Sequence, residues 1–491
     1  MGPAAVTGAG AGLDLGGMQG LVARAYGHQP FSRYLFLAIG DPAAARRWVG
    51  ELLPEVDTAA HRPSGAEPGT CVNVAFTCAG LERLGLGADA LATFPRPLAE
   101  GIVTGHRSRI LGDVGPNAPS GWRWGGPATP AVHVLVLLYA ATREALDAAT
   151  DGRRAAWTAG GALSEAAPPI DGRILDPPGV EHFGFADGLS QPVVKGWPGA
   201  EEASSTRPPA PVAPIKWTQV NPGEVVLGCD DNFGTPAEGP TVGGRSRAGA
   251  GLPVAPWARG RRHLGHAGTW LVARQLAQDV AGFRRYVQEA GVGPGSSPEL
   301  LAAKMVGRWP NGAPLVLAPD HEDPAVAAAN DFGYHVDQYG VRCPVGAHIR
   351  RSNPRDSSAD HPERARKSTL NHRILRRGRS YGLQYLDPPT RPGEEAGAER
   401  GLMFLCLNTD VERQFEFVQG TWLANRSFGG LYGEVDPVTG NQPEGGGRFT
   451  RPADPVRRPV TGLPSFVTVR GGGYFFLPGL AALRYLAAMQ G

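Results

Sequence analysis

The stretch VRCPVGAHIRRSNPRD, residues 341–356, places one imidazole, that of His348, among small residues and directly before arginines. An imidazole can bind a metal ion, although a single histidine beside apolar residues more often has a structural role. The residues that follow are strongly basic, which indicates a bound anion. The basic residues are Arg350, Arg351, Arg355, Arg364, Arg366, Lys367, Arg373, Arg376, Arg377 and Arg379, and only Asp356, Asp360 and Glu363 oppose them.

Three readings of this basic cluster are open. It could bind the phosphates of a nucleic acid, bind the carboxylates of a cofactor, or form a solvated surface. The whole chain has 48 Lys and Arg against 46 Asp and Glu, and this near-neutral balance makes a nucleic-acid partner the weakest of the three. Haem carries two propionates and needs an axial ligand such as imidazole, so a haem site would use both the cluster and His348.

A second candidate site is the stretch EHFGFADGLSQP, residues 181–192, in which Asp187 lies between small residues. An aspartate in a glycine-rich setting is commonly a turn-capping residue. Beside a haem iron, however, the same carboxylate could carry a proton between the two oxygens of a bound peroxide. A nearby arginine would stabilise the negative charge that develops on the leaving oxygen and would keep the acid ionised.

These stretches resemble the signatures of a known family. GFADG at 184–188, CPVGAHIRRSNPR at 343–355 and HRILRRGRSYG at 372–382 are similar to the three signature stretches of the dye-decolorising peroxidases. RYLFLAIGDPAAARRW near the start and LMFLCLNTDVERQFEFVQGTW near the end also resemble segments of this family. The likeness therefore covers most of the chain outside its long loops, and the chain length resembles that of the larger bacterial and fungal members.

The resemblance implies one non-covalent haem b per chain, held mainly by the C-terminal half. It makes His348 the axial ligand of the iron, Asp187 the acid–base residue on the opposite face, and Arg376 the arginine beside it. Leu402 and Phe404 would line the pocket on that face. Hydrogen peroxide would be the oxidant, and bulky aromatic dyes and phenolic compounds would supply single electrons. Because an unperturbed aspartate titrates near about 3.9 and an arginine lowers this value, we expect the best turnover at acidic pH.

Four further residues have less specific roles in this resemblance. Glu412 fits an acidic partner that accepts a hydrogen bond from the second nitrogen of His348, and Asp410 is its competitor. His182 and Arg350 would pair with the haem propionates, although a salt bridge to a neighbouring loop explains Arg350 equally well.

Three aromatic residues could relay electrons towards the surface. Tyr381, Tyr385 and Trp422 are oxidisable, but aromatic residues in such segments more often belong to the core. Some compact relatives have an asparagine two positions after the arginine of the active site. In this chain the position is Gly378, so any role of that amide is absent.

Strands alternate with helices in both halves of the sequence, which indicates how these residues are positioned. The unit RYLFLAIGDPAAARRWVGELL reads as a strand followed by a helix, and TWLVARQLAQDVAGFRRYVQEA repeats this pattern late in the chain. We therefore predict an α+β fold of two duplicated ferredoxin-like domains, each an antiparallel sheet with helices packed on one face. The proline-rich run at 205–217 separates the domains, which we place at 1–205, with the GFADG motif, and 206–491, with the haem.

Composition adds limits on class and location. The chain has 491 residues, 42% hydrophobic and 19% charged, which favours two or three globular units, whereas 70 glycines and 46 prolines indicate long loops. We expect such surface loops at 230–266, 353–368, 387–399 and 433–462.

Cysteine usage and the absence of an apolar run bear on the compartment. The five cysteines include no C-x-x-C pair, which favours reduced thiols, and no segment reaches the roughly 18 apolar residues of a membrane span. We expect a cytoplasmic monomer or homodimer without a membrane partner. The main alternative function is a non-catalytic haem carrier or sensor, which would use His348 but not Asp187 or Arg376.

Overall fold

The first half of the chain forms a β–α–β–β–α–β unit. In the computed structural model, the described residues are 13–60, 69–197, 219–244, 248–293, 295–357, 361–385, 398–452 and 456–489. Strand order within this half is β4-β1-β3-β2, and all pairs are antiparallel. Its main elements are β1 (Phe31–Ile39), α2 (Pro42–Leu52), β2 (Thr70–Phe76), β3 (Val134–Ala140), α7 (Arg143–Thr158) and β4 (Leu163–Arg173).

The second half repeats this unit with longer insertions. Its strand order is β11-β12-β9-β15, which is the order of the first half when the strands are numbered within each unit. The predicted duplicated ferredoxin-like α+β fold is therefore confirmed. The elements are β9 (Thr269–Gln278), α9 (Val280–Ala290), β10 (Leu375–Arg376), β11 (Arg379–Tyr381), β12 (Gly401–Asn408), the π-helical segments η9 (Glu412–Glu416) and η10 (Val418–Leu423), and β15 (Val467–Leu477).

The two sheets join edge to edge into one ring of strands. At one junction β4 pairs with β11, and at the other β2 pairs with β15 through Phe76 and Phe476. Since β12 also pairs with β9, the pairings close on themselves. Edge strands left open would expose unpaired backbone groups, so the two junctions protect the edges of each half. The predicted boundary at residue 205 lies outside the described residues, and the division at that position stays a prediction.

Alternating residues of the strands enter two different cores. Phe36, Leu405 and Phe475 belong to a cluster that combines the inner faces of both sheets. Their neighbours in sequence face the helices, as expected from the period of two along a strand. The cavity described below lies on this helix-bearing face of the second sheet, where the residues of β9 and β12 alternate between core and cavity.

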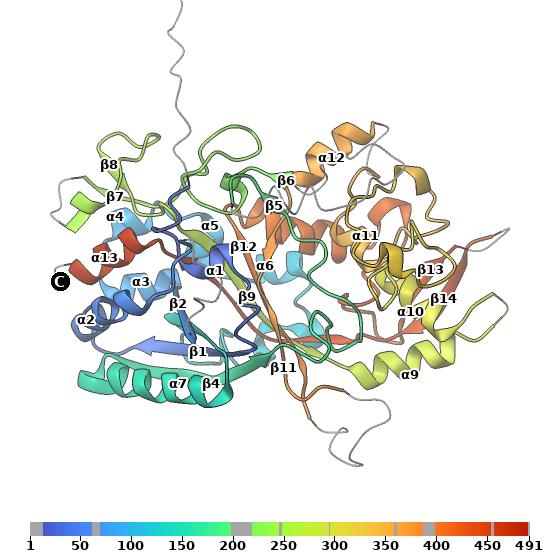
Figure 1. Ribbon diagram of the computed structural model, residues 1–491, viewed down its shortest axis with the longest axis horizontal. Coiled ribbons are helices and arrows are strands. Elements are labelled where there is room, and N and C mark those ends of the chain that lie inside the picture. Colours follow the sequence, from blue (N-terminus) through green and yellow to red (C-terminus); the bar gives the residue numbers. More distant parts are fainter. Residues whose placement is uncertain are drawn as a thin grey trace, which may run out of the picture.

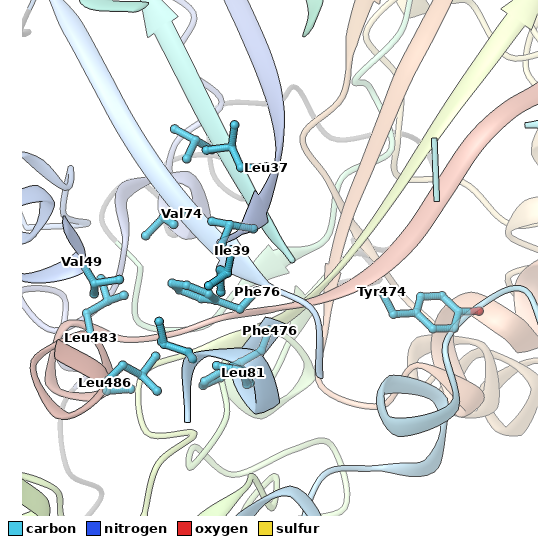
Figure 2. Close-up of a cluster of buried hydrophobic side chains, with 14 of the residues drawn as sticks. Leu37, Ile39, Val49, Val74, Phe76, Leu81, Tyr474, Phe476, Leu483 and Leu486 are labelled. Atoms are coloured by element: carbon cyan, nitrogen blue, oxygen red, sulfur yellow. The ribbon is translucent and has the colours of Figure 1, made fainter. Parts of the chain in front are cut away.

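Helix α13 (Leu480–Ala488) of the second half packs on the first half. Figure 2 shows Leu483 and Leu486 near Val49 of α2, within one buried cluster. The sequence sets where α2 begins, because the Asp41 side chain accepts a hydrogen bond from the Ala44 N–H and Pro42 occupies the first turn. The two halves are thus joined by a helix contact as well as by the sheet.

Short elements complete the fold (Figure 1). The expected loops contain some of them: the β7–β8 hairpin lies in 230–266, whereas α12 begins in 353–368 and the β13–β14 hairpin in 433–462, and both run past the end of the predicted loop. Most of 387–399 is outside the described residues. None of the helices in the described ranges is long and apolar enough to span a bilayer. Within the described residues, the other α-helices are α1 (Gly20–Ala23), α3 (Cys78–Leu84), α4 (Ala88–Leu91), α5 (Arg96–Glu100), α6 (Gly105–Leu111), α10 (Pro298–Val306), α11 (His348–Ser352) and α12 (Pro362–Leu370), and the other strands are β5 (Val193–Val194), β6 (Gln219–Val220), β7 (Thr241–Gly243), β8 (Arg261–His263), β13 (Gly447–Arg451) and β14 (Arg458–Leu463).

Candidate active site

A cavity of about 740 Å³ lies where the two halves meet. This volume is within the usual range for a cofactor site. The segment with the GFADG motif contributes one part of its lining, and α11, β10 and β12 of the second half contribute much of the rest. His348, Asp187, Arg376, Leu402 and Phe404 all line it, so the structure brings together five of the residues that the sequence singled out.

His348 is the first residue of α11 and is held by a buried carboxylate. Its Nδ1 lies 2.9 Å from Oδ2 of Asp436, whose side chain is fully buried. The other oxygen of Asp436 accepts hydrogen bonds from the N–H groups of Val438 and Thr439 and from the Thr439 hydroxyl. The carboxylate therefore fixes the proton on Nδ1, which leaves Nε2 as the nitrogen available to a ligand.

The pKa values of this pair follow from burial and charge. Burial lowers the pKa of His348, but the attraction and hydrogen bond of Asp436 outweigh it, and the net shift is upward. For Asp436, burial raises the pKa, but His348 and the surrounding donors lower it by more. The Asp436 carboxylate is thus held ionised against the imidazole.

The expectation that Glu412 or Asp410 accepts this hydrogen bond is wrong. The Glu412 side chain is 58% exposed and lies 3.4 Å from Arg107 of α6, and Asp410 caps the N–H of Arg413. Asp410 lies just before η9 and Glu412 is its first residue. The first turn of η9 faces α6 rather than α11. The true partner lies in 433–462, which the sequence suggested to be a surface loop. The DPVTG turn signals a capping aspartate, but nothing in its spacing indicates the contact with His348.

Asp187 and Arg376 form an ion pair across the junction of the two halves. Oδ1 of Asp187 accepts hydrogen bonds from the Gly188 N–H at 2.6 Å and from Nη1 of Arg376 at 2.8 Å. Gly188 has a φ of 79°, which favours glycine at this position. Among the described residues, no hydrogen bond to Oδ2 is found, so one oxygen of the carboxylate is available to a ligand in the cavity.

The charge of Arg376 determines the ionisation of Asp187. Burial raises the pKa of Asp187, but Arg376 and the Gly188 N–H lower it by more, so the net pKa lies below the usual value of 3.8. His348 contributes a further lowering, and Asp187 in turn raises the pKa of His348. The two groups therefore interact electrostatically through the cavity, although they come from different halves of the chain.

His182 and Arg350 do not reach the cavity. Nε2 of His182 lies 2.9 Å from the Tyr381 carbonyl, and the ring is 3% exposed. Arg350 is buried against a neighbouring loop, where it donates to the Cys343 carbonyl at 2.7 Å and to the Asp337 carbonyl at 2.8 Å. Neither residue lines the cavity, so the structure gives no contact that supports the expected pairing with propionates, and the alternative of an interaction with a neighbouring loop holds for Arg350.

Other cations of the basic cluster line the cavity instead. Arg373 donates to the Ser190 carbonyl at 2.7 Å, and burial together with Arg355 and Arg376 lowers its pKa to about 9. No acid among the described residues contributes to the pKa of Arg373. Nδ2 of Asn353, on the same lining, is buried without a hydrogen-bond partner in the described part of the chain. Such uncompensated donors fit an anionic group of a bound ligand.

The lining as a whole fits haem. It combines an imidazole with a free nitrogen, an acid–arginine pair, buried cations for carboxylates, and apolar surface from Leu402 and Phe404. The sequence cluster contained Arg355 and Arg373 but did not separate them from the solvated arginines. Only burial distinguishes them, and burial depends on contacts that are distant in sequence.

Comparisons with known proteins show the family to which the chain belongs. The sequence matches no protein-family model. It is 30% identical to dye-decolorizing peroxidase msp1 of Mycetinis scorodonius, over 92% of this chain and 83% of the relative, and 30% identical to the multifunctional dye peroxidase DyP2 of Amycolatopsis, over 92% and 91%. The structure resembles an ancestral D-type dye-decolorizing peroxidase with a TM-score of 0.76 and 27% identity, covering 98% of this chain and all of the other.

The duplicated ferredoxin-like fold, with a histidine and an acid–arginine pair in one cavity, defines an oxidoreductase of the peroxidase class. The chain belongs to the dye-decolorizing peroxidase family, and the resemblance seen in its motifs is confirmed.

Proposed function

We propose that this chain is a haem b peroxidase that uses hydrogen peroxide to oxidise bulky aromatic dyes and phenolic compounds in single-electron steps. The observation that carries the proposal is that one cavity is lined by His348, which Asp436 holds from behind, and by the Asp187–Arg376 pair. Two relatives that are 30% identical to this chain are named as dye peroxidases, which supports dyes as substrates. A solved dye-decolorizing peroxidase that resembles this chain with a TM-score of 0.75 and 25% identity was determined in complex with 2,6-dimethoxyphenol, which supports phenols.

His348 would hold the iron through Nε2. Asp436 accepts the Nδ1–H hydrogen bond, and this makes the imidazole a stronger electron donor. Haem, when bound, supplies the redox chemistry. Arg373 and Asn353 would bind the propionates. The Arg373 guanidinium lines the cavity without a compensating acid, and the Asn353 amide lines it without a hydrogen-bond partner among the described residues.

Asp187 would move the proton of hydrogen peroxide. Its free Oδ2 accepts the proton of the inner oxygen and returns it to the outer oxygen, which leaves as water. Arg376 keeps Asp187 ionised before the proton transfer and stabilises the negative charge that develops on the leaving oxygen. A non-catalytic haem carrier or sensor would need neither residue.

A cytoplasmic location is part of the same proposal. Cys78, Cys229, Cys343 and Cys406 form no disulfide in the described part of the chain, as is usual in a reducing compartment.

Asp187→Asn tests the catalytic assignment directly. The amide preserves the shape but accepts no proton, so we expect a normal Soret band and a rate constant with peroxide about 10²–10⁴ times lower. The matched control is Asp147→Asn. It removes an aspartate of α7 that also pairs with an arginine, Arg33 of β1. Stopped-flow spectroscopy measures both variants. Wild-type rates with peroxide in Asp187→Asn would show that the catalytic assignment of Asp187 is wrong.

A further inference from the structure

The side chain of Gln191 binds both backbone polar groups of Arg376. The Arg376 N–H donates to Oε1 at 3.0 Å, and Nε2 donates to the Arg376 carbonyl at 3.2 Å. Gln191 follows the Asp187 turn, only four residues later in the sequence, and does not line the cavity. The Gln191 amide thus takes the place that a neighbouring strand would occupy.

This contact satisfies the open edge of β10. On its other side β10 pairs with β12, where Arg376 faces Cys406 and the Arg377 N–H donates to the Leu405 carbonyl. The polar backbone groups of Arg376 point away from β12, and a partly buried backbone without partners is costly. Gln191 pairs both of them, and Nη1 of Arg377 also donates to the Arg376 carbonyl at 3.3 Å.

The loop that carries Asp187 therefore binds Arg376 at two points. Oδ1 of Asp187 accepts from its guanidinium, and Gln191 pairs with its backbone. A third contact, from Arg373 to the Ser190 carbonyl, binds the same loop to the same segment. Together these contacts close a ring from Asp187 through the loop to Arg376 and back.

We propose that Gln191 is a positioning residue that fixes the Arg376 guanidinium relative to the Asp187 carboxylate, and so sets the rate of the reaction with peroxide. This inference rests on the proposed roles of Asp187 and Arg376. Those two residues come from different halves of the fold, so their separation depends on how the halves meet. Displacement of a catalytic group by about 1 Å can lower a rate about 10²-fold.

The chain contains a matched control for this contact. Gln384 makes the same pair of hydrogen bonds with the backbone of Asp176: the Asp176 N–H donates to its Oε1 at 3.0 Å, and its Nε2 donates to the Asp176 carbonyl. Both bonds are exposed, and neither residue lines the cavity. Gln384→Met therefore removes an equivalent clamp without affecting the site.

The experiment compares holoenzymes of Gln191→Met and Gln384→Met. We expect Gln191→Met to lower kcat/KM for hydrogen peroxide by about 10- to 100-fold, with the KM of the aromatic reductant unchanged, and Gln384→Met to match the wild type. Association of cyanide with the ferric enzyme provides a readout without turnover, because hydrogen cyanide must also give up its proton. It should slow in Gln191→Met alone. Wild-type rates for peroxide and cyanide in Gln191→Met would overturn the proposal.

Gln191→Glu keeps the inference testable if the methionine variant folds poorly. A protonated glutamic acid can accept from the Arg376 N–H and donate to its carbonyl, whereas the ionised form repels the carbonyl oxygen. The rate should approach the wild type at acidic pH and fall below it as pH rises. A constant ratio to the wild type across pH would contradict the clamp. If Asp187→Asn is impaired but the Gln191 variants are not, the clamp is wrong and the proposed function stands.

Discussion

The two acid pairs of the cavity differ in origin and in how far their carboxylates are satisfied. His348 and Asp436 both come from the second half, and the Asp436 carboxylate accepts four hydrogen bonds in a fully buried position. Asp187 and Arg376 come from different halves, and only Oδ1 of the aspartate is bonded. A saturated carboxylate suits a fixed role in holding a ligand, whereas one with a free oxygen suits proton transfer.

His348→Ala should have the largest effect, because it removes the nitrogen that the Asp436 pair presents to the cavity. We expect loss of the Soret band and of bound haem in the absorption spectrum and haem assay. His335→Ala, at an exposed histidine near α11, should bind haem normally. Full haem content and an unchanged spectrum in His348→Ala would rule out the axial role.

Arg376→Leu should come next. Without the guanidinium, the charge on the leaving oxygen is not stabilised, and we expect a rate constant with peroxide about 10²–10³ times lower at unchanged haem content. Stopped-flow mixing measures it. Arg96→Leu, which breaks an exposed helical ion pair with Glu100, is the control. Equal rates in the two variants would show that the charge of Arg376 is not used.

Asp436→Asn tests whether Asp436, rather than the Glu412 expected from the sequence, is the functional partner of His348. Loss of the carboxylate should weaken electron donation by the imidazole, raise the Fe(III)/Fe(II) potential and lower haem affinity about 10- to 100-fold. Glu412→Gln should change neither quantity, because Glu412 contacts Arg107 instead. Spectroelectrochemical titration of both variants decides between them, and a shift in Glu412→Gln alone would reverse the assignment.

The acid limit of activity is the smallest predicted effect. The pKa of Asp187 is lowered in the folded protein, so its working ionised form persists until pH falls through that lowered pKa, and the acid limb should lie below pH 3.8. Arg376→Leu removes the largest contribution that lowers the pKa of Asp187, so the limb should move to higher pH. A pH profile of the peroxide reaction measures both. The same limb in both enzymes would exclude Asp187 as the group that titrates.

The sequence predicted the duplicated unit and the five residues that meet in the cavity, because strand–helix alternation and compact motifs are local signals. Asp436 was missed because it lies 88 residues from His348, in a segment rich in glycine and proline. The pairing of β4 with β11 joins residues more than 200 positions apart, and no periodicity encodes it. Arg373 is buried in the cavity lining, whereas Arg350 is buried against a neighbouring loop. Contacts between residues distant in sequence determine this difference.

A crystal structure of the haem-loaded enzyme tests the central claim most directly. We predict that Nε2 of His348 binds the iron on one face of the porphyrin while Oδ2 of Asp187 and the Arg376 guanidinium face the other. An iron ligand other than His348, or Asp187 on the same face as the histidine, would contradict the account.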